Sequence, residues 1–178
     1  MSKIVLTNKE AGLNPSSEEL ASIVLARIGL APRKAGATEK MHRVLLELYE
    51  RAKASNRDKR PELAVMTVEE MALHAGITRQ TMYDYLKRWL ALNIITKTSY
   101  IKEEKVIIGY KLNGPTLENA FEKAILAINN NLQITQRYIQ ELQKLLKNEK
   151  IGAAMGAKRS EEAIEGAQDS DSDQNILK

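Results

Sequence analysis

Hydrophobic residues recur along the chain at two different spacings, and the change between them predicts the order of the elements. Spacings of three and four residues, which place side chains on one face of a helix, occur over residues 17–29, 38–54, 67–75, 78–91 and 116–149. Two runs of β-branched and aromatic residues, 94–101 and 106–112, flank a charged turn and predict a β-hairpin. Residues 55–61 are polar and predict a loop. The fold class is therefore mostly α with a small β-hairpin.

The same pattern divides the chain into four parts. Residues 1–37 hold one short helix, 38–114 hold three helices and the hairpin, and 115–149 form a long C-terminal helix in which Asn129-Asn130-Asn131 is a candidate kink or break. Residues 150–178 are rich in Gly, Ala, Ser, Asp and Glu and show little periodicity, so a disordered tail is expected there.

The strongest local signal lies between Thr67 and Ala91. Thr67 followed three residues later by Glu70 is a capping box, which starts one helix, and Thr78 caps the next. Gly76 supplies the left-handed backbone that a tight turn between two helices requires. The spacing of the small residue, the turn and the apolar ties is that of a helix-turn-helix: Ala72, Gly76, Ile77, Met82 and Tyr85.

The second of these helices has two contrasting faces. Its apolar residues fall at positions i, i+3, i+4, i+7 and i+8 (Met82, Tyr85, Leu86, Trp89, Leu90), which leaves a polar face free. Arg79 can bind guanine O6 and N7 with two hydrogen bonds, and Gln80 can bind adenine in the same way. Thr78 and Thr81 stand near the helix N-terminus, where phosphate is favoured. The pattern favours double-stranded DNA as the partner over a helix whose exposed face merely happens to be polar.

Residues 38–112 resemble a winged helix-turn-helix domain, and the stretch from Ala75 to Leu86 resembles prokaryotic transcription regulators of the MarR, TrmB and PadR kind, archaeal members in particular. The resemblance implies a recognition helix, residues 78–91, in the major groove and a wing on the DNA backbone or minor groove. It implies the following DNA-facing residues: Thr78, Arg79, Gln80, Thr81, Tyr83 and Lys87, with Lys102 and Lys105 at the wing tip. Glu103 and Glu104 in the same tip depart from this pattern, since carboxylates repel phosphates.

The long C-terminal helix is predicted to join two copies of the chain. A wide apolar stripe on a helix of this length exceeds what a domain of about 75 residues can cover, and the resemblance also implies dimers on palindromic sites. The alternative is that the helix packs on its own domain. The expected dimerisation residues are Leu117, Phe121, Ala124, Ile128, Leu132, Tyr138, Leu142 and Leu145.

Composition and charge narrow the function further. The net charge is +4, and because residues 150–178 carry −2, the rest carries +6, which favours a polyanionic partner. The chain has no Cys, and His42 and His74 stand on different predicted helices, so neither a metal nor another cofactor is expected. The stretch from Gly152 to Lys158 is not predicted to be a phosphate-binding loop, because it has three residues between its glycines where such a loop needs four. No membrane span, signal peptide or catalytic constellation is apparent, so a cytoplasmic protein that is not an enzyme is expected.

The prediction from sequence is therefore a sequence-specific, DNA-binding transcriptional regulator that acts as a homodimer, with the transcription machinery as a candidate further partner. Two alternatives stay open. One is a plasmid-type replication or partition factor that uses the same domain. The other is a winged-helix subunit that binds proteins and never meets DNA.

Overall fold

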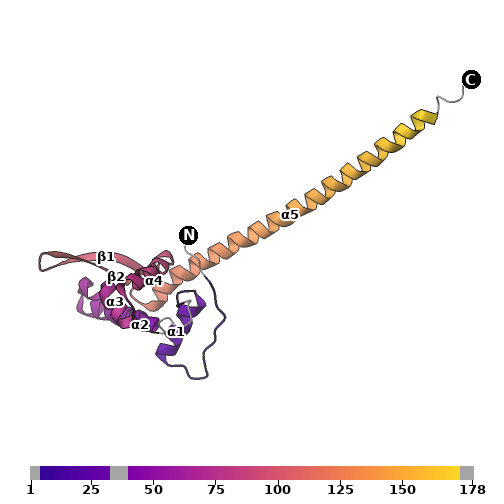
Figure 1. Ribbon diagram of the computed structural model, residues 1–178. Coiled ribbons are helices and arrows are strands. Elements are labelled where there is room, and N and C mark those ends of the chain that lie inside the picture. The colour runs from indigo at the N-terminus through magenta and orange to yellow at the C-terminus, as the bar shows by residue number, and fades with distance from the viewer. Residues whose placement is uncertain (1–4, 33–39, 173–178) are drawn as a thin grey trace, which may run out of the picture. The chain divides into compact units, whose positions relative to one another are not determined.

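The order of elements follows the sequence pattern closely. The computed structural model describes residues 5–32 and 40–172. Its elements are α1 (Ser17–Arg27), α2 (Met41–Asp58), the 3-10 helix η1 (Pro61–Ala64), α3 (Val68–Ala75), α4 (Arg79–Ala91), β1 (Ile95–Lys102), β2 (Lys105–Leu112) and α5 (Leu117–Ser172) (Figure 1). The predicted fold class, mostly α with a small hairpin and a long C-terminal helix, is confirmed.

The turn between α3 and α4 is built as predicted. The Thr67 hydroxyl accepts a hydrogen bond from the Glu70 amide (3.3 Å), and the Glu70 carboxylate accepts one from the Thr67 amide (2.7 Å), which completes the capping box. Gly76 ends α3 in the left-handed conformation, with φ of 66°. The amide of Ile77 donates to the carbonyl of Ala72 (3.0 Å), so the chain reverses within a few residues before α4 begins.

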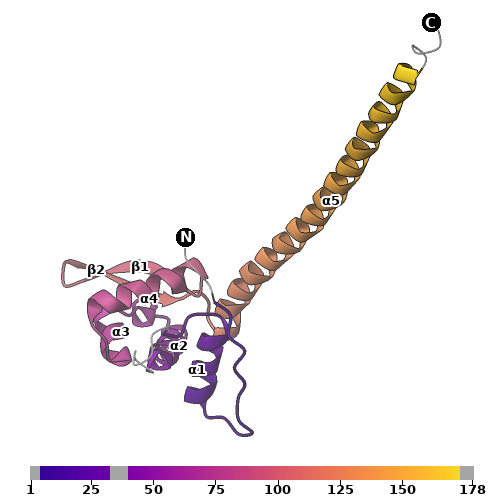
Figure 2. The same cartoon turned by 45° about the vertical axis from the view of Figure 1, so that its right-hand side comes forward.

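The hairpin is a single antiparallel pair with a two-residue turn. Its register runs from Ile95 opposite Leu112 to Lys102 opposite Lys105, so the strands extend slightly further than predicted and the turn is shorter. An isolated bridge between Met66 and Tyr110 ties the base of the hairpin to the segment before α3. Gly109 is required beside this bridge, because a Cβ there would lie 2.6 Å from the Met66 carbonyl oxygen. Both views show the hairpin beside α3 and α4 (Figures 1 and 2).

One hydrophobic core holds these elements together. Trp89, Met71, Met82 and Leu48 are fully buried, and they join residues of α1, α2 and both strands. The core relies on Leu, Ile and Met because the chain has a single Trp and a single Phe. Among the described residues, no polar or charged residue is buried in this core.

The C-terminal end of α2 corrects the predicted loop at 55–61. The helix continues to Asp58, ends at Lys59 in the left-handed conformation, and is followed at once by η1, which begins at Pro61. Polar side chains are compatible with an exposed helix end, and the first residue that cannot continue a helix is Pro61. The predicted start of this helix at Thr38 lies outside the described residues.

The long helix α5 corrects the predicted end at Glu149 and the predicted disorder of the segment that follows. The helix runs unbroken through Asn129-Asn130-Asn131 and on to Ser172; residues 173–178 lie outside the described part. Five alanines between 150 and 172, together with Glu and Lys, supply enough helix propensity to outweigh three glycines. Two compact units divide at Ile128, rather than at the predicted boundary of 114.

Candidate nucleic-acid interface

Helix α4 separates its apolar and polar side chains as the sequence predicts. Met82, Tyr85, Leu86 and Trp89 are buried against the core. The opposite side carries five of the predicted DNA-facing residues, of which Tyr83 is half-buried and the others are exposed: Arg79, Gln80, Thr81, Tyr83 and Lys87. The structure thus places these five on one helix, and most of them are open to a partner.

The N-terminus of α4 is capped by the predicted threonine. The Thr78 hydroxyl accepts a hydrogen bond from the Thr81 amide (3.2 Å), and the two hydroxyls lie 2.9 Å apart. Both residues are exposed. A helix N-terminus with hydroxyls beside it favours an anion, because the helix dipole and the first amides point toward it. This end of α4 is therefore suited to a phosphate group of a nucleic acid.

Arg79 is already engaged within the chain. Its Nε lies 3.0 Å from Oε1 of Glu69, at the start of α3, and its Nη2 donates to the Tyr83 hydroxyl at 3.2 Å. The guanidinium also lies over the Tyr83 ring, 5.7 Å from its centre. The hydrogen bond to Tyr83 and the charge of Glu69 raise the pKa of Arg79 further. Arg79 must give up or share Glu69 before it can bind a base or a phosphate.

Lys87, about two helical turns further along than Arg79, has a partner as well. Its ammonium group lies 3.0 Å from Oδ1 of Asp84. The sequence pattern did not single out Glu69, which lies in the first turn of α3, or Asp84. Glu69 and Asp84 offset the charges of Arg79 and Lys87, so this face is less positive than its basic residues alone suggest.

The wing tip brings the predicted lysines together. Lys102 and Lys105 are exposed and are partners across the strands, and Glu103 and Glu104 form the turn between them. Two further exposed side chains, Ile101 and Val106, face one another in the next pair of the register. The wing therefore offers an apolar pair behind a tip of mixed charge.

Arg88 anchors α4 to the N-terminal segment, a role that the sequence did not predict. Its Nη1 donates to the carbonyls of Gly29 (2.8 Å) and Ala31 (3.2 Å), and the guanidinium lies 4.9 Å from the centre of the Tyr85 ring. These contacts hold α4 from the side that faces the core. No local pattern could have marked this residue, because its partners are nearly sixty positions away.

The predicted dimerisation residues fall into two groups. Ala124 is fully buried in the core of its own chain, so it is not open to a second copy, and Leu117, Phe121 and Ile128 are partly buried against that core. These four residues belong to the first turns of α5, which pack against the same core as α1 to α4 and the hairpin. Four others remain exposed on the second compact unit: Leu132, Tyr138, Leu142 and Leu145.

Other kinds of site find little support within residues 5–32 and 40–172. Three or more His, Asp or Glu side chains gather nowhere in this part in a way that could hold a metal ion. No helix among the described residues is both long enough and apolar enough to cross a bilayer. Comparison with family models, with curated proteins and with solved structures found no match for this chain.

Proposed function

We propose that this protein is a sequence-specific transcriptional regulator that binds double-stranded DNA with α4 in the major groove. The observation that carries the proposal is the polar face of α4, exposed on a helix whose other face is locked into the core behind the Gly76 turn. The activity proposed is binding, without catalysis.

The residues of this face divide the work by chemistry. Arg79 and Gln80 suit base edges, because each can form two hydrogen bonds to a purine. Thr78, Thr81 and Lys87 suit phosphates and would fix the register of the helix. Tyr83 lies between them and offers its ring or hydroxyl to a base or sugar. Lys102 and Lys105 would contact the backbone beside the groove.

We further propose that the protein acts as a homodimer on a palindromic site, joined by the exposed part of α5. Leu132, Ile139 and Leu146 recur every seven residues, and Leu142 lies between the last two, which is the spacing of a coiled-coil seam. Each of these side chains is at least half exposed in the single chain. A second copy of the same helix would bury them.

Selection of binding sites from random duplex DNA tests the proposal. The expected result is one recurrent sequence with two inverted half-sites, whose affinity falls as salt rises because phosphate contacts release counterions. Absence of any retardation of duplex DNA in a gel at low salt would overturn it. A single origin-like locus, rather than promoters, in genome-wide mapping would favour the replication or partition alternative instead.

A second candidate function has one observation of its own. Ile101, Val106 and Ile108 are exposed on the same face of the hairpin, with 76%, 65% and 53% of their surfaces open. Apolar side chains on a solvent-facing strand are typical of a protein contact. If duplex DNA is not bound, Ile101→Ser with Val106→Ser should abolish the protein partnership, which co-purification from the native host would measure.

A further inference from the structure

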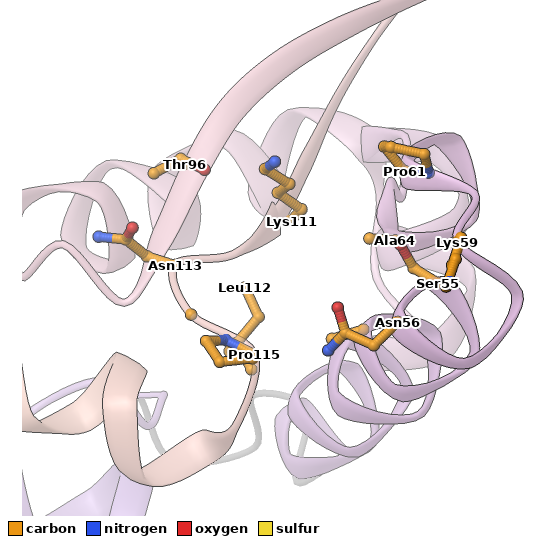
Figure 3. A pocket seen from close by; sticks show the side chains of 12 residues that line it. Ser55, Asn56, Lys59, Pro61, Ala64, Thr96, Lys111, Leu112, Asn113 and Pro115 are labelled. Atoms are coloured by element: carbon orange, nitrogen blue, oxygen red, sulfur yellow. The ribbon is translucent and has the colours of Figure 1, made fainter.

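A cavity opens at the base of the hairpin, away from the polar face of α4. Its volume is about 530 Å³, within the usual range for small-molecule sites. One wall comes from the end of α2 and from η1, and the other from the hairpin base and the loop before α5 (Figure 3). The residues that line it are Ala52, Ser55, Asn56, Lys59, Pro61, Ala64, Thr96, Lys111, Leu112, Asn113, Gly114 and Pro115.

The charged residues that line this cavity are all positive. Lys59 and Lys111 line it, and no acidic residue is among the described residues that do. The two acids adjacent in sequence to lining residues have cations of their own: Asp58 lies 2.7 Å from Arg57, and Glu62 lies 2.8 Å from Arg60. Neither Lys59 nor Lys111 forms an ion pair with any described residue. The two ammonium groups thus remain available to an anion.

A third cation contacts Asn113, one of the residues that line the cavity. Lys123 binds only neutral oxygens among the described residues, namely the side-chain carbonyl of Asn113 at 3.2 Å and its main-chain carbonyl at 3.5 Å. Leu112 and the two prolines give the lining an apolar part, while Ser55, Asn56 and Thr96 add uncharged polar groups. Such a lining fits a ligand with an anionic group, some hydroxyl or amide character and a small apolar part.

The register of the hairpin separates this cavity from the side of the hairpin that lies near Tyr83 of α4. Lys111 pairs with Thr96, and both line the cavity. The next pair, Tyr110 with Lys97, points to the opposite face because side chains alternate along a strand. Tyr110 is close enough to Tyr83 of α4 for the two phenols to interact, which adds to burial in raising the pKa of Tyr110. Helix α4 therefore lies toward the face of the hairpin opposite the cavity, whereas Lys102 and Lys105 at the tip share the side-chain alternation of Thr96 and Lys111.

We propose that this cavity is a binding site for a small organic anion, a phosphate or carboxylate compound of the size of a nucleotide or smaller. Lys59 and Lys111 hold the anionic group, with Lys123 adding to the field. Ser55, Asn56 and Thr96 bind its polar part, and Leu112 supports its apolar part. The site stands whether or not the chain binds DNA, since none of its residues belongs to the proposed DNA surface.

The test is a titration of the full-length, isotope-labelled protein with adenosine monophosphate and with citrate, at constant ionic strength, followed by amide chemical shifts. The expected result is saturable shifts at Ser55, Asn56 and Lys111 for at least one probe. In Lys59→Met with Lys111→Met the affinity should fall about tenfold or more, since two charge-assisted bonds are lost. Lys97→Met removes one lysine from the opposite face of the same hairpin and should leave the affinity unchanged, whereas Lys111→Met alone should lower it.

Three results would overturn the proposal. One is the absence of shifts with either probe at about 5 mM, a concentration at which even a site with a Kd of about 1 mM would be mostly occupied. Another is an equal loss of affinity in Lys97→Met, which would show a general attraction to a basic protein. The third is that a short DNA duplex shifts the Ser55 and Lys111 amides and that adenosine monophosphate competes with it, which would make the cavity a contact for DNA phosphate.

Discussion

At the scale of single residues, the most informative contact is the ion pair between Arg79 and Glu69. Glu69 pairs with the guanidinium on the polar face of α4, and under the proposed function it would compete with DNA for the same charge. Both side chains of the pair are largely exposed, so its net contribution to the free energy of folding is small. Its effect on binding is nevertheless measurable.

Glu69→Gln is expected to strengthen binding to the selected duplex by roughly two- to fivefold, because Arg79 no longer has to leave a carboxylate. Arg79→Ala should weaken binding by about 1–3 kcal/mol and relax the preference at one base pair. Fluorescence anisotropy at fixed salt measures both effects. The control is Glu50→Gln on α2, whose carboxylate pairs with Lys53. Equal strengthening in the control would mean that only the total charge matters.

Glu70 makes the capping turn of α3 sensitive to acid. Partial burial opposes its charge, but the hydrogen bonds from the Thr67 amide and from Arg51 outweigh this and lower the pKa of Glu70. A carboxyl whose pKa is lowered by folding stabilises the fold above its ordinary pKa, and this contribution disappears as the pH falls through the lowered value.

Glu70→Gln is therefore expected to reduce the free energy of unfolding at pH 7 by about 0.5–1 kcal/mol, after allowance for solvent screening. The difference from wild type should shrink as the pH is lowered below about 4.5, the ordinary Glu value, and vanish in stronger acid. Urea unfolding at a series of pH values measures it. A difference that stayed constant with pH would show that the charge of Glu70 has no part in the capping turn.

At the scale of elements, the hairpin turn conflicts with its own sequence. Glu103 and Glu104 have positive φ angles of 50° and 62°, as a tight two-residue hairpin turn demands, although Asn and Gly are the residues that suit such a turn. Residues with a Cβ pay about 1–2 kcal/mol in this conformation. The same two carboxylates lie between Lys102 and Lys105, where they oppose a phosphate.

Replacing the turn by Glu103→Asn with Glu104→Gly should stabilise the protein by about 1–2 kcal/mol and tighten DNA binding. Thermal unfolding and anisotropy measure the two effects separately. Glu103→Gln with Glu104→Gln is the matched control, since it removes the charge and keeps the backbone strain. It should tighten DNA binding without adding stability, and a stabilisation equal to that of the Asn-Gly turn would refute the strain.

The elements also show what the sequence can and cannot predict. The α3–α4 unit was predictable because its signals are local: the capping box at Thr67, the glycine of the turn and the spacing of buried residues. The hairpin was predictable from its β-branched residues. The ends of α2 and α5 were not, since polar residues are common both in loops and in exposed helices. The partners of Arg79 and Arg88 depend on packing between helices, which no spacing along the chain encodes.

At the scale of the whole molecule, α5 serves two different needs. Its first turns place Ala120 and Ala124 in the core of the first unit. From the sequence alone, a stripe of apolar residues that packs on its own domain looks the same as one that packs on a second copy. From Asn129 onward the helix forms a unit of its own with apolar side chains exposed in rows. In water a single helix with such a face has no tertiary packing to stabilise it, so association of two copies is the simplest way to bury it.

Substitution on the two sides of α5 tests this association. Ile139→Ser with Leu146→Ser removes two side chains of the seam, and sedimentation equilibrium should show a shift from dimer to monomer. Arg137→Ser with Lys144→Ser changes positions two residues earlier, on the opposite side of the helix, and the dimer should persist. The control pair loses at least as much helix propensity as the test pair, because Arg and Lys are as good helix formers as Leu and better ones than Ile.

DNA binding by the same variants separates the dimer from the recognition helix. If two copies hold two half-sites, the Ile139→Ser, Leu146→Ser variant should lose most of its affinity for the full palindrome and retain weak binding to a single half-site, because each α4 is intact but no longer linked to its partner. A wild-type protein that is monomeric at the concentrations where it retards DNA would remove the dimer from the proposal and leave the α4 surface standing. Equal loss of affinity in both double variants would instead indicate that the charge or helicity of α5, rather than its apolar seam, supports DNA binding.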